Sequence, residues 1–251
     1  MAEQKGILPV KGTIGNLTFY KSKDGYLLRE KGGIDAKRIA SDPAFQRTRE
    51  NGAEFGKAGK AGKLLRNAVR AFSKNASDGR MVSRLTGKMM EVIKTDTTNP
   101  RGLRKPIDGE IELLQDFEFN INGKLATTLF APFTAEIDRV TGDLSVTIPP
   151  FIPLNMLAVP AGTTHFQINS AGAEIDFEGN RYTVATQNTV GLPWDNVATN
   201  EITLSNVITA NSALPLFLLL GIEFLQEVNG SMYPLKNGAF NALSLIKVSG
   251  Q

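Results

Sequence analysis

The strongest constraint on the fold comes from residues 108–251, where short extended runs are separated by turn-forming pairs. Asn122-Gly123, Asn229-Gly230 and Asn237-Gly238 are such pairs, and Asn-Gly is a strong short-range signal for a hairpin turn. The runs predicted as strands are FEFNI, TAEID, LSVTI, HFQIN, AEIDF, RYTVA, EITLSNVI, LFLLLGIEFLQEV and FNALSLIKV. About eight short strands at this spacing predict an antiparallel β-sandwich, Ig-like or jelly-roll-like.

Two long runs in this part, residues 216–228 and 239–248, are predicted to be its central strands, because both are apolar over most of their length. The segment IPPFIPLNMLAVPAG cannot be a central strand throughout, since its prolines cannot donate ladder hydrogen bonds. We expect it to be a long crossing loop that exposes an apolar patch.

Residues 37–107 have a helical pattern instead. Asp42 and Pro43 form a start signal, with aspartate as the N-cap and proline in the first helical position. Apolar or small residues then recur near a period of 3.6, at Phe45, Ala53, Phe55, Ala58, Gly59, Gly62, Leu65, Val69 and Phe72. After a break at KNASDG, a second helix is expected with Met81, Leu85, Met89 and Val92 on one face.

The first 36 residues contain two short extended runs joined at Asp24-Gly25, which predicts a β-hairpin preceded by an extended arm. The sequence therefore predicts an α+β protein in three parts. These are an N-terminal arm and hairpin (1–36), a basic segment of two helices (37–107) and an acidic antiparallel β-sandwich (108–251).

The stretch GAEFGKAGKAGKLL holds glycines at positions 52, 56, 59 and 62, interleaved with lysines. This spacing does not give the phosphate-binding G-x-x-x-x-G-K-[ST] motif, and Leu64 stands where the hydroxyl is needed. A flexible linker is one alternative, but the flanking periodicity favours a helix. Each interior glycine costs about 1 kcal/mol relative to alanine, so we expect a close-packed neighbour against Gly56, Gly59 and Gly62.

Charge is divided unevenly along the chain. Residues 1–110 hold 23 Lys and Arg against 12 Asp and Glu, a net charge of +11, and residues 111–251 hold 5 against 13, a net charge of −8. Such asymmetry favours either nucleic acid or the acidic half of another copy as the partner of the basic half. The candidate electrostatic contacts are Arg47, Arg49, Lys57, Lys60, Lys63, Arg66 and Arg70.

No catalytic signature is present. The chain has no cysteine and one histidine, His165, so a transition-metal site of the usual nitrogen and sulfur type is not expected. The carboxylate groups Asp116/Glu118, Glu136/Asp138 and Glu174/Asp176/Glu178 each follow a period of two, which predicts solvent-facing positions on strands. We expect no enzyme, cofactor, metal or small-molecule substrate, and we interpret Trp194 as an anchor for packing or assembly.

The N-terminus shows no secretory signal, and the apolar run 213–222 is far shorter than the ~20 residues of a membrane span. We therefore expect synthesis in the cytoplasm, no membrane span, and a protein that is part of a particle.

The segments GTIGNLTFY, GYLLRE and DPAFQRTRENGAEF, together with GIEFLQEVNGSMYPLKNGAFNALSLIKV, resemble a family of uncharacterised proteins from Bacteroidota. The resemblance implies a bacterial or phage source and a layout of hairpin, basic helical segment and β-rich domain, without an activity. This layout is also similar in style to viral and phage structural subunits.

From these patterns we predict a non-enzymatic subunit that self-assembles into a capsid-like, tubular or filamentous particle. We expect a homo-oligomer in which the basic half of one copy contacts the acidic half of the next, head to tail. The alternative is a nucleic-acid-binding protein that uses the basic segment 37–105, which holds 17 Lys and Arg against 6 Asp and Glu.

Overall fold

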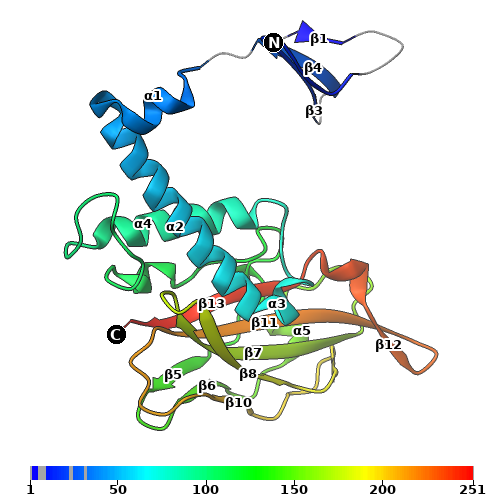
Figure 1. Ribbon diagram of the computed structural model, residues 1–251. Helices are drawn as coiled ribbons and strands as arrows, with labels where there is room; N and C mark the ends of the chain where they lie inside the picture. The colour runs from blue at the N-terminus through cyan, green and yellow to red at the C-terminus, as the bar shows by residue number, and fades with distance from the viewer. Residues whose placement is uncertain (1, 5–9, 23–24, 31–32, 251) are drawn as a thin grey trace. The chain divides into compact units, whose positions relative to one another are not determined.

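The computed structural model describes residues 2–4, 10–22, 25–30 and 33–250 (Figure 1). It contains helices and several antiparallel sheets, which confirms the α+β class. The chain divides into two compact units, Met1–Arg49 and Glu50–Gln251. The division into three parts by composition stays a prediction.

The first unit contains a four-stranded antiparallel sheet in the order β1-β4-β3-β2. Its strands are β1 (Ala2–Glu3), β2 (Gly12–Ile14), β3 (Leu17–Ser22) and β4 (Gly25–Glu30). Ser22 pairs with Gly25, so the predicted hairpin is confirmed. Asp24 of the predicted turn lies outside the described residues.

The register of this sheet gathers its apolar side chains on one face. Ile14 pairs with Leu17, and Phe19 pairs with Leu28, so these four side chains point to the same side of the sheet. Threonines, with Tyr20, Leu27 and Arg29, alternate onto the other side. None of the described side chains in this unit is buried, and Ile14 is 65% exposed. The sheet is thus amphipathic, and the described residues of the first unit do not bury its apolar face.

The helical region begins with α1 (Ala36–Ser41), the 3-10 helix η1 (Pro43–Phe45) and α2 (Gln46–Ala68). The Asp42 side chain accepts a hydrogen bond of 2.9 Å from the Ala44 N–H, and Pro43 comes directly after it, as the predicted start signal requires. The structure adds α1, which the sequence pattern did not predict.

In the second unit, α2 is followed by α3 (Arg70–Ser73) and α4 (Met81–Thr95). The predicted break at residues 74–79 is confirmed. Helix α4 buries Met81, Leu85, Met89 and Val92, as its pattern predicts. Shorter helices are η2 (Ile111–Leu114), η3 (Leu125–Thr127), α5 (Pro153–Met156) and η4 (Leu235–Gly238).

The β-rich part contains two antiparallel sheets. The three-stranded sheet has the order β10-β6-β5 and consists of β5 (Thr134–Asp138), β6 (Asp143–Ile148) and β10 (Ile202–Val207). The six-stranded sheet has the order β12-β11-β7-β8, with β13 beside β11 and β9 beside β7. Its strands are β7 (His165–Asp176), β8 (Arg181–Asn188), β9 (Leu192–Pro193), β11 (Leu216–Val228), β12 (Ser231–Pro234) and β13 (Ala242–Ser249).

Strand β11 has a hydrophobic cluster on each of its two faces. Phe217 and Leu219 belong to a cluster with residues of α2 and α4, whereas Leu218 and Leu220 belong to a cluster with β6 and β10. Figure 1 shows the same layering within this unit, with helices α2 and α4 and strands β5, β6 and β10 on opposite sides of the six-stranded sheet. Burial of both faces explains why β11 is almost continuously apolar, and it confirms the prediction of a central strand.

Three strand predictions need correction. HFQIN and AEIDF belong to one strand, β7, because small residues between them continue the ladder. FEFNI is not a strand: Asp116 has a positive φ of 62° after η2, and only Glu118 forms an isolated bridge, to Ser244. Strand β13 is not central, because it pairs with β11 on one side and with this irregular segment on the other.

Candidate functional site

A cleft of about 750 Å³ lies beside α2, and it collects most of the lysines that the sequence singled out. Its walls come from α2, from residues 105–107 and from the β7–β8 turn with the start of β8. Lys57, Lys60 and Lys63 line it from α2, and Lys105 lines it from the loop after α4. The remaining lining residues are Ala61, Leu64, Asn67, Pro106, Ile107, Phe177, Glu178, Asn180 and Tyr182.

Two buried carboxylates position the loop that carries Lys105. Asp96, at the end of α4, accepts hydrogen bonds from the backbone N–H groups of Asn99 and Lys105, both at 2.9 Å. Burial opposes ionisation of Asp96, but these bonds favour the carboxylate, and its pKa lies below the ordinary value. Glu54 of α2 is buried and accepts a hydrogen bond of 2.8 Å from the Gly102 N–H. The loop is therefore tied both to α4 and to α2.

Gly102 is required for this loop geometry. Its φ of +88° is strained for residues with a side chain, and an added Cβ would lie 3.0–3.2 Å from Glu50. The carbonyl oxygens of Gly102 and Arg104 accept hydrogen bonds from the Lys57 ammonium, at 3.3 and 3.0 Å. Lys57 is thus partly used within the fold, although these carbonyls do not neutralise its charge.

The other lysines of the cleft differ in their partners. Lys105 forms an ion pair with Glu178, and this hydrogen bond raises the pKa of the Lys105 ammonium above its ordinary value. Lys60 and Lys63 are exposed and make no hydrogen bond or ion pair within the part of the chain that the structure describes. The cleft therefore presents four ammonium groups and one carboxylate.

The glycine face of α2 is only partly packed. A Cβ added at Gly62 would lie 3.5 Å from Leu85 Cγ, which is an ordinary contact with α4. At Gly52, Gly56 and Gly59 an added Cβ would meet nothing within 4 Å among the described residues. Among the described residues, the expected neighbour is thus present at Gly62 but not at the other three positions. Phe55 was predicted on the buried stripe, but it is 61% exposed because the stripe contacts α4 only in its second half.

The arginines selected from the sequence lie in different settings. Arg49 donates hydrogen bonds to the carbonyl oxygens of Ile39 and Asp42, at 2.7 and 2.9 Å, so it fixes the turn between α1 and α2. Arg47 is exposed on the first turn of α2. Arg66 and Arg70 make no polar contact within the described residues, and Arg70 is exposed. Neither Arg66 nor Arg70 lines the cleft.

Trp194 and His165 both lie near β9. Trp194 is half-buried and packs against the cluster between the two sheets. Its backbone N–H donates a hydrogen bond to the Thr164 carbonyl oxygen, at 2.9 Å. His165 Nε2 lies 3.9 Å from Glu227 Oε2, and its Nδ1 lies 3.0 Å from the Thr164 hydroxyl. Both residues make contacts within the β-rich part, and the indole Nε1 of Trp194 is buried without a hydrogen-bond partner among the described residues.

The carboxylates predicted on solvent faces are not all exposed. Glu174 is 7% exposed, because its face of β7 points toward the three-stranded sheet. Glu118 is half-buried and lies outside any strand; burial raises the pKa of its carboxyl, although the Leu125 N–H donates to it at 3.0 and 3.1 Å. Asp176 is held by Arg181, at 2.9 Å, with a pKa below the ordinary value because the Gly179 N–H and Arg181 donate to it. For Glu174 and Glu118 the prediction was wrong.

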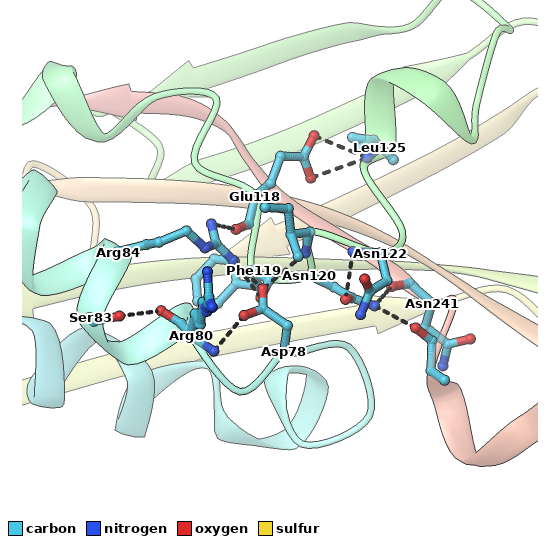
Figure 2. A network of polar contacts seen from close by, with 12 residues as sticks. Asp78, Arg80, Ser83, Arg84, Glu118, Phe119, Asn120, Asn122, Leu125 and Asn241 are labelled. Carbon is cyan, nitrogen blue, oxygen red and sulfur yellow. Dashed lines mark hydrogen bonds and ion pairs between the residues drawn. The ribbon is translucent and has the colours of Figure 1, made fainter. Parts of the chain in front are cut away.

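A second cluster of polar side chains joins the α3–α4 loop to the β-rich part (Figure 2). Asp78 accepts hydrogen bonds from the backbone N–H groups of Arg80, at 2.6 Å, and Ile121, at 2.9 Å. Arg84 forms an ion pair with Asp78 and donates a hydrogen bond of 2.6 Å to the Glu118 carbonyl oxygen. Apart from Arg84 Nε, which is buried without a partner among the described residues, these groups satisfy one another, so the cluster is a structural clamp rather than an open site.

Asn120 and Asn241 extend this clamp to the start of β13 (Figure 2). The Asn120 side chain donates to the Asn241 carbonyl oxygen at 2.8 Å. The Asn241 side chain donates to the Asn75 carbonyl oxygen at 3.1 Å and accepts from the Phe224 N–H at 3.1 Å. No sequence pattern indicates this cluster, because its members are far apart along the chain.

The described residues contain neither a cluster of metal ligands nor a helix of membrane-spanning type. Among them, no three His, Cys, Asp or Glu side chains gather as a metal site would need. No described helix combines the length and the apolar character needed to span a membrane.

A scan against protein-family models finds no match, and a search of curated proteins finds none either. A solved structure from work on "pH-induced modulation of Streptococcus parasanguinis adhesion by Fap1 fimbriae" is similar to this chain, with 15% identity and a TM-score of 0.28. The similarity covers 54% of this chain and 88% of that chain. A TM-score of this size carries no argument about fold or function.

Proposed function

We propose that the protein is a non-enzymatic structural subunit that self-assembles into a capsid-like, tubular or filamentous particle. The observation that carries this proposal is the apolar face of the first unit, formed by Ile14, Leu17, Phe19 and Leu28, which the described residues of that unit do not bury. A single small sheet gains independent stability only when its apolar face packs against something. We infer that a second copy covers this face.

Charge indicates which part of the second copy makes the contact. Residues 1–49 hold 10 Lys and Arg against 5 Asp and Glu, a net charge of +5, and residues 111–251 carry −8. Complementary charge steers association and fixes its register. A contact between the first unit of one copy and the acidic β-rich part of the next is head-to-tail. Repetition of such a contact gives a ring or an open filament.

The open glycines of α2 support a second contact in the same assembly. Gly52, Gly56 and Gly59 leave space for close approach of another chain, and exposed Phe55 lies on the same helix. These glycines reduce the intrinsic stability of the helix by roughly 3 kcal/mol in total, which a packing partner would offset.

The proposal also includes the type of β-sandwich, the source of the protein and the place where it is made. We infer that the two sheets of the β-rich part form an Ig-like or jelly-roll-like sandwich, which their shared hydrophobic cluster supports. We also propose a bacterial or phage source related to the Bacteroidota proteins, and synthesis in the cytoplasm before assembly.

The proposal is tested by sedimentation velocity and negative-stain microscopy of the full chain across a salt series. We expect ordered particles at low salt that dissociate as salt screens the charged contacts. Ile14→Asp places a charge on the apolar face and should abolish the particles. Thr13→Asp is the matched control, because it adds the same charge to the same strand on the opposite face.

A second pair of variants tests the glycine face. Gly59→Leu should fold, because a Cβ added at this position meets nothing within 4 Å among the described residues, and it should weaken assembly by blocking close approach. Gly87→Leu on α4 also enters open space and should leave assembly unchanged. A monomer at every salt and protein concentration would refute self-assembly, and equal effects of Ile14→Asp and Thr13→Asp would refute the proposed face.

Nucleic-acid binding by residues 37–105 is the second candidate function. It is favoured by Lys60 and Lys63, whose ammonium groups have no partner among the described residues, and by the net charge of +11 on this segment. Phosphate contacts of lysine and arginine supply most of the affinity of nonspecific nucleic-acid binding.

A further inference from the structure

We infer that the cleft beside α2 is a binding site for a nucleotide unit, with its phosphate on Lys60 and Lys63 and its base on Tyr182. The inference rests on nucleic-acid binding, the second candidate function, and names the site where it occurs. The shared ligand chemistry is a phosphate joined to a flat heterocycle. A free nucleotide and a single-stranded nucleic acid both supply it.

The charge of the cleft favours a phosphate ligand. Lys57, Lys60, Lys63 and Lys105 bring four ammonium groups, and Glu178 is the one carboxylate that lines the cleft. Lys60 and Lys63 have no partner of their own among the described residues. An anion that enters therefore gains contacts with these two lysines without breaking an existing ion pair.

Helix geometry places these lysines in a row. Residues three apart on a helix are neighbours on its surface, about 5–6 Å apart between Cβ atoms. Lys57, Lys60 and Lys63 have this spacing, and Asn67 continues the row by four residues with a side-chain amide. All four residues line the cleft, so a charged backbone that follows α2 would meet each of them.

The opposite wall supplies an aromatic surface. Tyr182 on β8 is 46% exposed and lines the cleft, and Phe177 lines it closer to the core. Bases of any sequence stack on such side chains in single-strand binding proteins. Ala61, Leu64 and Pro106 add apolar surface. An acidic peptide could form ion pairs with the lysines equally well, but it has no base to stack on the aromatic wall. The lining therefore favours a nucleotide.

Glu178 acts as an internal competitor at the rim of the cleft. Its carboxylate pairs with the Lys105 ammonium, and both side chains are roughly half-exposed. An incoming phosphate meets repulsion from Glu178 and competes with it for Lys105. Removal of this carboxylate should therefore strengthen binding, which is the opposite sign to removal of a lysine.

The test measures binding of a fluorescein-labelled deoxythymidine 12-mer to the full chain by fluorescence anisotropy, at low and moderate salt. Isothermal titration with ATP and with thymidine monophosphate distinguishes a free nucleotide from a strand. Unlabelled poly-glutamate is the competitor that represents an acidic protein partner. We expect the 12-mer to bind and poly-glutamate to compete poorly at equal charge concentration.

Matched variants locate the site. Lys60→Glu/Lys63→Glu should weaken binding of the 12-mer at least tenfold and reduce the slope of log affinity against log salt by roughly 0.7 per lost phosphate contact. Lys94→Glu/Lys124→Glu is the control, because it changes two exposed lysines outside the cleft and gives the same net charge. It should weaken binding less than threefold.

Two single variants test the roles of the opposite wall and the rim. Tyr182→Ala should weaken binding at least fivefold, whereas Tyr182→Phe should retain it, because stacking requires the ring and not the hydroxyl. Glu178→Gln should strengthen binding about threefold or more, by freeing Lys105. Circular dichroism confirms that each variant is folded.

The outcomes separate the site from the function. If no ligand binds the wild-type chain, both nucleic-acid binding and this site are refuted. If the 12-mer binds but Lys60→Glu/Lys63→Glu acts no more strongly than the control pair, the site is refuted while the function survives. If poly-glutamate competes as well as the 12-mer, or Tyr182→Ala has no effect, the cleft is a general anion surface and not a nucleotide site.

Discussion

The molecule contains two antiparallel sheet regions whose sequences carry similar strand and turn signals. They differ in how far their apolar side chains are buried. The sheet of the first unit has an apolar face with none of its described side chains buried, whereas the six-stranded sheet has a hydrophobic cluster on both faces. The difference lies in the described elements that pack on each sheet within its own unit. Helices α2 and α4 cover one face of the large sheet, and β6 and β10 cover the other.

This contrast teaches that strand formation and core formation are separate questions. Alternation and a turn pair suffice to predict a hairpin, because both are local. Stability requires apolar area to be removed from water in excess of the conformational entropy that is lost. The first unit has the local signals that form strands. We propose that it buries enough apolar area for stability only in an assembly.

The largest expected effect compares the same substitution in the two regions. Leu85→Ala removes a fully buried side chain from the cluster beside α2 and should lower the free energy of unfolding by about 2–5 kcal/mol. Leu28→Ala removes a half-buried side chain from the first unit and should change it by less than about 0.5 kcal/mol. Urea denaturation followed by the fluorescence of Trp194, the single tryptophan, reports on the second unit.

Equal shifts of the Trp194 unfolding transition by the two leucine substitutions would contradict this difference between the two regions. That result would mean that the first unit contributes to the stability of the second within a single chain. The proposed role of another copy would then lose its main support.

An intermediate effect is expected at the polar clamp. Asp78→Asn removes the charge that pairs with Arg84 and should destabilise the fold by about 1–3 kcal/mol at neutral pH. Asp138→Asn is the control, because Asp138 also has a lowered pKa but holds only its own turn, through Val140 and Thr141. It should cost clearly less stability than Asp78→Asn, because water replaces the hydrogen bonds of an exposed turn.

The same clamp gives a pH dependence of definite sign. Burial opposes ionisation of Asp78, but hydrogen bonds from the Ile121 and Arg80 N–H groups and from Arg84 bring its pKa below 3.8. Its stabilising contribution is therefore complete above the unfolded pKa of 3.8 and is lost as pH falls through the folded pKa. Acid unfolding curves should show a smaller loss of stability below pH 4 for Asp78→Asn than for the wild type, and an equal loss would contradict this assignment.

The smallest expected effect on stability comes from replacing glycine with alanine. We compare a position where an added Cβ meets no neighbour with one where it would clash. Gly59→Ala should stabilise the monomer by up to about 1 kcal/mol, since α2 gains helix propensity and the methyl group meets no neighbour. Gly123→Ala should destabilise it, because the added Cβ would clash with the Phe240 carbonyl oxygen. Thermal unfolding at protein concentrations below assembly measures both, and a loss of stability in Gly59→Ala would show a contact that the open space does not reveal.

Much of the fold was predictable because its signals are local. The start at Asp42-Pro43, the apolar face of α4 and the long central strand β11 result from capping chemistry and periodicity, and the structure confirms them. The wrong prediction of a strand at FEFNI shows where local signals fail. FEFNI alternates like a strand, yet its path is set by the left-handed Asp116 and by its packing beside β13, which no local pattern encodes.

The candidate site was predictable only in part. The lysine row could be recognised on α2 because i, i+3 spacing has a direct meaning on a helix. The wall that faces it could not, since Lys105 and Tyr182 are brought to the cleft by the buried Asp96, by Gly102 and by the fold of β7 and β8. The two walls are separated by roughly 50 to 120 residues along the chain, so no periodic pattern in the sequence indicates that they meet.

The irregular segment beside β13 has a consequence for aggregation. Asp116, Phe117 and Phe119 exchange backbone hydrogen bonds of 2.7–3.1 Å with Leu243 and Leu245, so they occupy the outer rim of β13. An occupied rim cannot template the growth of a cross-β stack. The apolar β11 is enclosed behind it, in the interior of the sheet. Copies of the chain at high concentration can therefore meet through other surfaces while the apolar β11 stays out of reach.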